Sequence, residues 1–189
     1  MPVNTRQKLI EVARQLFVNK GVAHTTMNDI ASASAKGRRT IYTYFKNKKE
    51  IFNAVLDDES ERLVEGLRAV AQGDGSVQER LRAFLRLRLE RFVAPSASSR
   101  LLERFKIETR KVERINERVR QKESAMMSQL LAEGCEQGVF SADRCQLFNG
   151  FFPLTLTVID SQAFSGSTPE ERAKAISQFI EFILTDISR

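Results

Sequence analysis

The sequence predicts an all-α protein made of two helical domains, and three observations support this fold class. Apolar residues recur with the period of an α-helix, about 3.6 residues, in most stretches of the 189-residue chain. Patterns that start a helix, in which Thr, Asn or Ser is followed three residues later by an acidic residue, open several of these stretches. No stretch shows the sustained alternation of apolar and polar residues that is typical of a half-buried strand.

Four helices are predicted before the first cluster of glycines. Gly21 follows the first helix and favours its C-terminus, and Thr26 with Asp29 opens the second. Gly73 ends the fourth helix. The expected ranges are 5–19, 27–34, about 38–45 and 47–71.

The rest of the chain predicts further helices separated by Gly, Pro and Ser. Gly138 ends one of them, and Ser141 caps the next. Thr168 caps the last helix, which has Pro169 at its first position and acidic residues in its first turn. The expected ranges are 76–93, a densely charged stretch over 100–124, a helix continuing to 137, 141–164 and 169–187.

Positive charge is concentrated in the first quarter of the chain. The whole chain carries 30 Lys and Arg against 24 Asp and Glu, a formal net charge of +6. Residues 1–50 hold ten of the basic residues and three acidic ones, and residues 31–49 hold six basic residues and no acid. This distribution favours a polyanionic partner, most often nucleic acid, and a solvated basic face is the alternative.

Residue usage argues against an enzyme, a metal site, a cofactor and a membrane protein. His24 is the only histidine, and no phosphate-binding, nucleotide-binding or hydrolase motif is present. The longest uncharged run, residues 145–159, is too short to cross a bilayer, and the N-terminus lacks the apolar segment of a secretory signal. We therefore expect a reducing, cytoplasmic location. Cys135 and Cys145 are interpreted as small buried side chains, with redox sensing as the alternative.

The short basic helix near residue 40 has the chemistry of DNA recognition, and it completes a predicted helix-turn-helix. Arg bonds guanine O6 and N7 in a bidentate way, Thr contacts the thymine methyl group, and Tyr and Lys suit phosphates. Ile41 and Phe45 share the opposite face and are expected to pack against Ile30 and Phe17. The residues expected to contact DNA are Thr26, Lys36, Arg38, Arg39, Thr40, Tyr42, Thr43, Tyr44 and Lys48.

Residues 5–52 resemble the DNA-binding domain of the TetR family of transcriptional regulators. The resemblance rests on Phe17, Gly21, the segment TTMNDIA at 25–31 and the segment TIYTYFKNKKEIF at 40–52. The family's turn usually reads Gly-Val-Ser before the recognition helix, whereas this chain has Ala35-Lys36-Gly37. The resemblance implies phosphate contacts by Thr26, Tyr42 and Lys48, and a major-groove face formed by Arg38, Arg39, Thr40, Thr43 and Tyr44.

The resemblance also implies a DNA-binding domain over residues 1–52 and a helical effector-binding and dimerisation domain over residues 53–189. In the family, the last two long helices of each chain form a four-helix dimer interface. A two-fold dimer would place its recognition helices on successive major grooves of a pseudo-palindromic operator. A single large core within one chain is the alternative. The residues expected at the interface are Phe151, Thr155, Ile159, Ile176, Ile180 and Ile183.

A small apolar or amphipathic effector is expected in the C-terminal domain. Arg88 lies on an apolar stripe between Phe84 and Phe92, so it needs an internal ion pair, a path to solvent or an acidic group of the effector. Pro153 interrupts an apolar helix, and the resulting kink either opens space for a ligand or fits a bend in the packing. The residues considered for effector binding are Phe84, Arg88, Phe105, Phe148 and Phe152, and each Phe is more simply a core residue.

Together these observations favour a homodimeric DNA-binding transcriptional regulator, a repressor whose effector stabilises a conformation with low operator affinity. Two alternatives stay open. An architectural or partner-recruiting DNA-binding protein would bind DNA independently of any small molecule. A helical enzyme would need a cleft that holds acidic groups with shifted pKa values.

Overall fold

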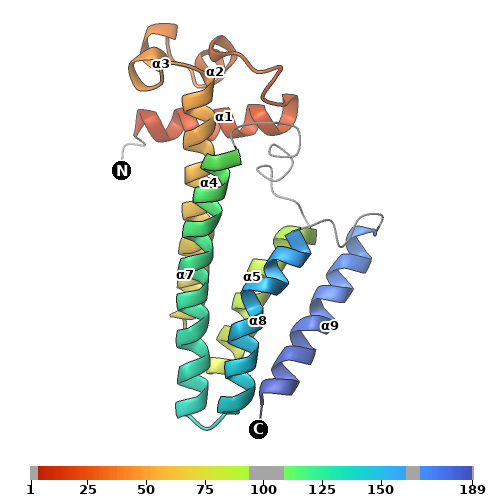
Figure 1. Ribbon diagram of the computed structural model, residues 1–189. Coiled ribbons are helices and arrows are strands. Elements are labelled where there is room, and N and C mark those ends of the chain that lie inside the picture. The colour runs from red at the N-terminus through yellow and green to blue at the C-terminus, as the bar shows by residue number, and fades with distance from the viewer. Residues whose placement is uncertain (1–3, 94–108, 161–166, 189) are drawn as a thin grey trace. The chain divides into compact units, whose positions relative to one another are not determined.

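A computed structural model describes residues 4–93, 109–160 and 167–188 of the chain, and these residues are almost entirely helical (Figure 1). The all-α prediction is confirmed: within the described residues, the β-structure is limited to one isolated bridge between Phe140 and Ser188. The helices are α1 (Thr5–Lys20), α2 (Met27–Ala33), α3 (Arg38–Tyr44), α4 (Lys48–Ala71), α5 (Val77–Val93), α7 (Thr109–Glu136), α8 (Ala142–Asp160) and α9 (Pro169–Ile187). None of these helices combines the length and the apolar character that crossing a membrane requires.

The observed helix ends follow the local capping signals. Thr26 and Thr168 each form a complete capping box with the acidic residue three positions later. Gly21, at φ 83°, follows α1 and donates its backbone N–H to the Phe17 carbonyl. The charged stretch and the helix after it form one continuous helix, α7, from residue 109 onward, because no breaking residue separates them. The parts of the predictions that fall on 100–108 and 161–164 lie outside the described residues.

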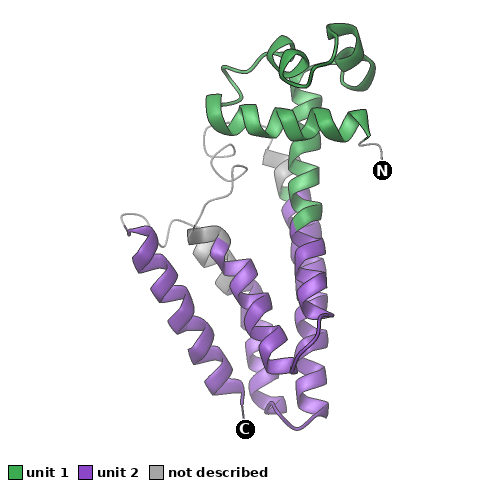
Figure 2. Cartoon of the chain, turned by 180° about the vertical axis from the view of Figure 1, so that it is seen from behind, with its two compact units in different colours: residues 1–62, 95–113 green, residues 63–94, 114–189 purple. Residues whose placement is uncertain are grey.

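The chain divides into two compact units (Figure 2). Unit 1 contains residues 1–62 and 95–113, and unit 2 contains residues 63–94 and 114–189. Helix α4 contributes residues to both units, so the boundary predicted at residue 52 stays a prediction.

Unit 1 is built around the helix-turn-helix. Helix α1 packs on α2, and α2 packs on α3. Phe17, Ile30 and Ile41 are fully buried, and the ring of Phe17 meets that of Phe52 edge-on at 5.8 Å between centroids. Phe45 is also buried, with 3% of its surface exposed. The side of α3 that carries Ile41 and Phe45 is therefore committed to the core, as the sequence predicts.

A polar network also joins α1 to α4 within unit 1. Gln7 donates from Nε2 to Asp58 Oδ1 at 2.5 Å, and Arg14 Nε lies 3.1 Å from Glu59 Oε1. Arg62 reaches Glu11 at 3.0 Å and Asp58 at 2.8 Å. These contacts add directional bonds to the apolar packing between the two helices.

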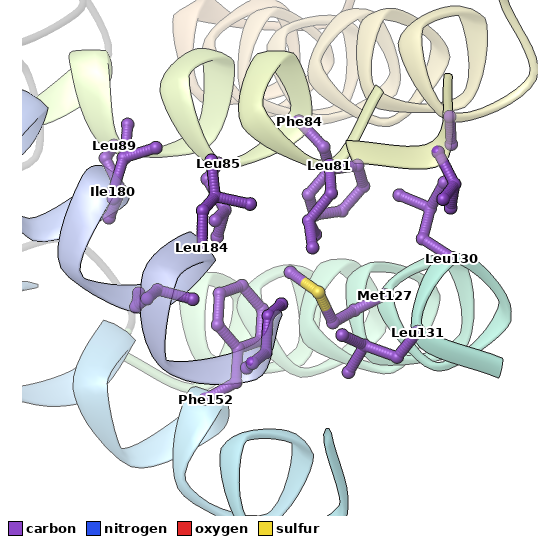
Figure 3. Close-up of a cluster of buried hydrophobic side chains, with 14 of the residues drawn as sticks. Leu81, Phe84, Leu85, Leu89, Met127, Leu130, Leu131, Phe152, Ile180 and Leu184 are labelled. Atoms are coloured by element: carbon purple, nitrogen blue, oxygen red, sulfur yellow. The ribbon is translucent and has the colours of Figure 1, made fainter. Parts of the chain in front are cut away.

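Unit 2 has an apolar core formed by the C-terminal part of α4 together with α5, α7, α8 and α9. Figure 3 shows Leu81, Phe84 and Leu85 of α5 near Met127 of α7, with Phe152 of α8 and Leu184 of α9 in the same cluster. Helix α9 packs against α5 and α8. This packing explains why the isoleucine stripe of α9 is covered within its own chain.

The connection between α7 and α8 is tightly bonded. Gly138 adopts φ 70° just after α7, and the Gly134 carbonyl accepts from the backbone N–H groups of Val139 and Phe140 at 2.9 and 3.0 Å. The Phe140 ring lies directly on Gly134, where a side chain would overlap it. Ser141 then donates its N–H to the Ile187 carbonyl at 2.8 Å, which ties this turn to the end of α9.

Candidate functional site

The N-terminus of α2 presents a capped helix end with an available hydroxyl group. The Thr26 hydroxyl accepts from the Asp29 N–H at 3.1 Å, and Asp29 Oδ2 accepts from the Thr26 N–H at 2.8 Å. These bonds, the backbone one first, lower the pKa of the Asp29 carboxyl, so the carboxylate is the form that caps the helix. The Thr26 side chain is exposed, and its hydroxyl proton remains able to donate to a phosphate oxygen.

The turn between α2 and α3 places its left-handed residue at Ala35, with φ 54°. Gly37, by contrast, has φ −65° and ψ 151° as the N-cap of α3, a conformation open to any residue. The glycine of the usual family turn is thus absent at the position where the backbone here is left-handed. Lys36 is exposed between these two residues and donates its N–H to the Ala31 carbonyl at 3.0 Å.

Helix α3 exposes nearly all of its polar residues on the side opposite its buried Ile41. Tyr42 and Tyr44 are 42% and 41% exposed, which is unusual for large aromatic side chains. The Arg38 guanidinium lies 5.7 Å from the centre of the Tyr42 ring, a cation–π contact that orders both side chains. Thr43 donates its hydroxyl to the Arg39 carbonyl at 3.0 Å, so its methyl group and oxygen lone pairs face outward. Arg38, Arg39 and Thr43 are exposed, and Thr40 is half-buried.

Lys48 is held by carbonyl groups at the start of α4. Its Nζ donates to the carbonyl oxygens of Val22 at 2.8 Å and Ala23 at 3.2 Å. The ammonium group has three donors, so one remains for a phosphate oxygen. The phosphate contact of Lys48 was predicted from the sequence. Its carbonyl contacts were not, because Val22 and Ala23 lie more than twenty residues away in the chain.

Two further residues support this surface and were missed by sequence reasoning. Arg6 of α1 lies over the Phe45 ring at 5.3 Å from its centre. Thr25 is fully buried and donates its hydroxyl to the Gly21 carbonyl at 2.8 Å, which fixes the α1–α2 connection. The Arg6 contact joins residues far apart in the chain and so depends on the tertiary fold, whereas Thr25 bonds a carbonyl only four residues before it. Within the described residues, no cluster of three or more His, Cys, Asp or Glu could hold a metal ion.

The helices that carry this surface match a family model. Residues 9–55 match the model described as bacterial regulatory proteins, tetR family. The DNA-binding region of this chain is thus similar to that of the tetR family of bacterial regulators. The resemblance of residues 5–52 to this family is thereby confirmed.

Curated proteins that match part of this chain are named as transcriptional regulators. It is 49% identical over 51 residues to the probable acrEF/envCD operon repressor of Escherichia coli. It is 45% identical over 53 residues to the HTH-type transcriptional regulator TtgR of Pseudomonas putida. These matches cover 27% and 28% of this chain and only 23% and 25% of the relatives. The sequence similarity therefore concerns about a quarter of each relative.

Solved structures extend the likeness in fold to nearly the whole chain. A TetR/AcrR-family regulator from Thermobifida fusca matches 97% of this chain and 98% of its own, with a TM-score of 0.72 and 22% identity. A transcriptional regulator from Saccharomonospora viridis, solved in complex with choline, matches 97% of both chains with a TM-score of 0.71 and 18% identity. At these identities the likeness concerns the fold alone.

Four of the five residues considered for effector binding, Phe84, Arg88, Phe148 and Phe152, lie in unit 2. Phe84 and Phe152 are core residues, and the half-buried Phe148 ring lies 5.7 Å from that of Phe152. Arg88 has an internal partner: its Nε lies 2.7 Å from Glu123 Oε1, and both side chains are buried. Phe105 lies outside the described residues. A shallow groove of about 240 Å³ on α5, lined by charged residues from Glu79 to Glu90, includes none of these candidates.

The residues expected at a dimer interface fall into two groups. Phe151 is 60% exposed, and the side chains of Thr155 and Ile159 lie outside the described residues. Ile176, Ile180 and Ile183 are at most 4% exposed and pack in the core of their own chain. Because they are buried against α5, these three isoleucines leave little surface for contact with a partner subunit. The stripe of isoleucines indicated burial correctly, but periodicity does not identify the covering element.

Proposed function

We propose that this chain is a sequence-specific DNA-binding repressor that acts as a homodimer and releases its operator when a small apolar or amphipathic molecule binds. The observation that carries the proposal is the exposed face of α3. This short helix combines two exposed arginines and two exposed tyrosines, while Ile41 behind them is fully buried. Side chains of this chemistry read base edges and bind phosphates in the major groove.

Flanking groups support this assignment of the DNA-binding face. Arg38 and Arg39 supply bidentate donors for guanine, and Tyr42 and Tyr44 supply hydroxyl groups for phosphates. Thr26 at the N-terminus of α2 and Lys48 at the start of α4 add donors on other elements of unit 1. A protein that neutralises several phosphates shows a steep loss of affinity as the salt concentration rises.

The test is selection of bound sequences from a random DNA pool, followed by fluorescence anisotropy on the selected sequence over a salt series. We expect an inverted repeat, because a two-fold dimer reads two equivalent half-sites. Arg39→Ala should weaken operator binding by roughly 5-fold to 100-fold, the range for loss of one bidentate base contact. Arg68→Ala, an exposed arginine on α4 paired with Glu65, is the matched control and should leave affinity unchanged. Equal affinity of the Arg39 variant and the wild type would refute the proposed recognition face.

Large apolar side chains left exposed on α8 and α9 support the dimer. Leu147, Phe151 and Leu154 of α8 are 58%, 60% and 59% exposed, and Phe182 of α9 is 69% exposed. The three α8 residues follow the helical repeat and so form one stripe. In sedimentation experiments, Phe182→Glu should shift the chain toward monomer, whereas Gln178→Glu, the same charge on an exposed polar residue of α9, should not. An unchanged dimer in the Phe182 variant would place the interface elsewhere.

The effector part of the proposal rests on the neighbouring Phe148 and Phe152 rings of unit 2 and on the likeness in fold. The solved regulator from Saccharomonospora viridis contains choline, which supports the capacity of this fold to hold a small molecule. In this chain the half-buried Phe148 beside Phe152 offers an apolar contact surface. A screen of amphipathic compounds for loss of operator anisotropy tests this part. A compound that releases the wild type should act more weakly on Phe148→Ala.

A further inference from the structure

The two cysteines of the chain lie on the two arms of one helical hairpin. Cys135 is in the last turn of α7, and Cys145 is in the first turn of α8. Cys145 is 5% exposed and belongs to the core of unit 2, and the half-buried Cys135 packs against the same core. Both side chains thus face the space between the two arms, although the sequence alone suggests two unrelated buried thiols.

The two thiols contact each other. The Cys145 thiol lies close enough to that of Cys135 to interact with it, both side chains pack in one core, and both residues are free thiols in this structure. The hairpin that brings them together is fixed by the bonds of Val139 and Phe140 to the Gly134 carbonyl and of Ser141 to Ile187. The proximity of the two thiols is therefore built into the fold of the hairpin.

We propose that Cys135 and Cys145 form a redox-sensitive site at which a low-molecular-weight disulfide converts the two thiols into an intramolecular disulfide joining α7 to α8. The chemical class of the oxidant follows from the site: an accessible thiol next to a buried one suits stepwise thiol–disulfide exchange.

The exchange proceeds in two balanced steps. The half-buried Cys135 loses its proton and attacks one sulfur of the small disulfide, which forms a mixed disulfide and releases one small thiol. Cys145 then loses its proton and attacks the Cys135 sulfur, which releases the second small thiol and leaves the protein disulfide. The protein gives up two electrons and two protons in total, and the small disulfide accepts both.

The order of the two steps follows from the surroundings of the sulfurs. Burial, and then the interaction with the Cys135 thiol, raise the pKa of the Cys145 thiol to about 12. Cys145 therefore stays protonated near neutral pH and is a poor first nucleophile. Cys135 is the more exposed sulfur, and its attack creates the mixed disulfide beside Cys145. The second step is then intramolecular, which compensates for the low thiolate fraction.

The experiment treats the reduced, full-length chain with oxidised glutathione under native conditions. The chain has only two cysteines, so thiol titration and intact mass report on this pair alone. We expect both thiols to disappear, with a mass lowered by two hydrogens, a monomeric band on a non-reducing gel and recovery by reductant. Cys145→Ser should instead accumulate glutathione at Cys135, and Cys135→Ser should react far more slowly than the wild type. Retention of both free thiols in the wild type, stable attachment of glutathione without ring closure, or disulfide-linked pairs of chains would overturn the proposal.

Discussion

Replacing Ala35 by glycine should stabilise unit 1, because Ala35 is the residue that holds the α2–α3 turn in a left-handed conformation. Its φ of 54° costs an L-residue about 1–2 kcal/mol relative to the right-handed region. Glycine removes this cost but adds roughly 0.4–1 kcal/mol of conformational freedom to the unfolded chain. The exposed methyl group contributes little packing. We therefore expect Ala35→Gly to raise the free energy of unfolding by about 0.5–1 kcal/mol.

The chain provides its own probe for this measurement. It has no Trp, and its two tyrosines, Tyr42 and Tyr44, both lie in α3, so tyrosine fluorescence during urea unfolding reports on unit 1. Ala33→Gly is the matched control, because it removes the same exposed methyl group from the last residue of α2. The control should destabilise by up to about 1 kcal/mol, the helical penalty for glycine. If both variants destabilise equally, Ala35 is not left-handed in solution and the argument fails.

Three other predictions concern packing, a buried ion pair and the start of α4. Gly134→Ala should destabilise unit 2 by about 1–3 kcal/mol or more in thermal unfolding, because its side chain would overlap the buried Phe140 ring. The control Gly150→Ala places its side chain in open space and should stabilise the protein by up to about 1 kcal/mol. Arg88→Met should lower the free energy of unfolding by about 3–5 kcal/mol, because it removes the guanidinium that faces the buried Glu123 carboxylate. The double variant Arg88→Met with Glu123→Leu should recover most of this loss in urea unfolding. Equal stability of the single and double variants would contradict the pairing. Lys48→Ala should weaken binding to specific and random DNA alike and reduce the salt slope by about one. The loss of its carbonyl contacts should also lower the stability of unit 1 by about 1–2 kcal/mol. An unchanged stability would show that those contacts contribute nothing.

The helices could be predicted closely because their ends depend on local chemistry. Thr26 and Thr168 satisfy free N–H groups within three residues, and that pattern is visible in the sequence. The basic face of α3 was also visible, since six basic residues without an acid lie in residues 31–49. The left-handed turn residue was not, because the usual marker of that conformation is a glycine and this chain has alanine there.

Contacts between distant residues could not be predicted in this way. Arg88 was correctly recognised as a charge on an apolar stripe, and the pattern favoured an internal partner or a path to solvent over an effector without naming the partner. The partner is Glu123, which lies on a different helix, and its identity depends on the register between α5 and α7. The hold of Lys48 on the carbonyls of Val22 and Ala23 is of the same kind. Sequence patterns describe what a side chain needs, whereas the tertiary fold determines which group supplies it.

Helix α9 carries apolar residues of two kinds, those buried within the chain and one that is available for a dimer interface. Its isoleucine stripe is satisfied within the chain, so Ile176, Ile180 and Ile183 give no driving force for dimerisation. Phe182 lies off that stripe and is 69% exposed. Burying such a side chain contributes about 1.5–3 kcal/mol, and in a two-fold dimer each residue is buried twice. Together with the exposed Phe151 on α8, Phe182 thus provides several kcal/mol of apolar driving force that a partner subunit would realise.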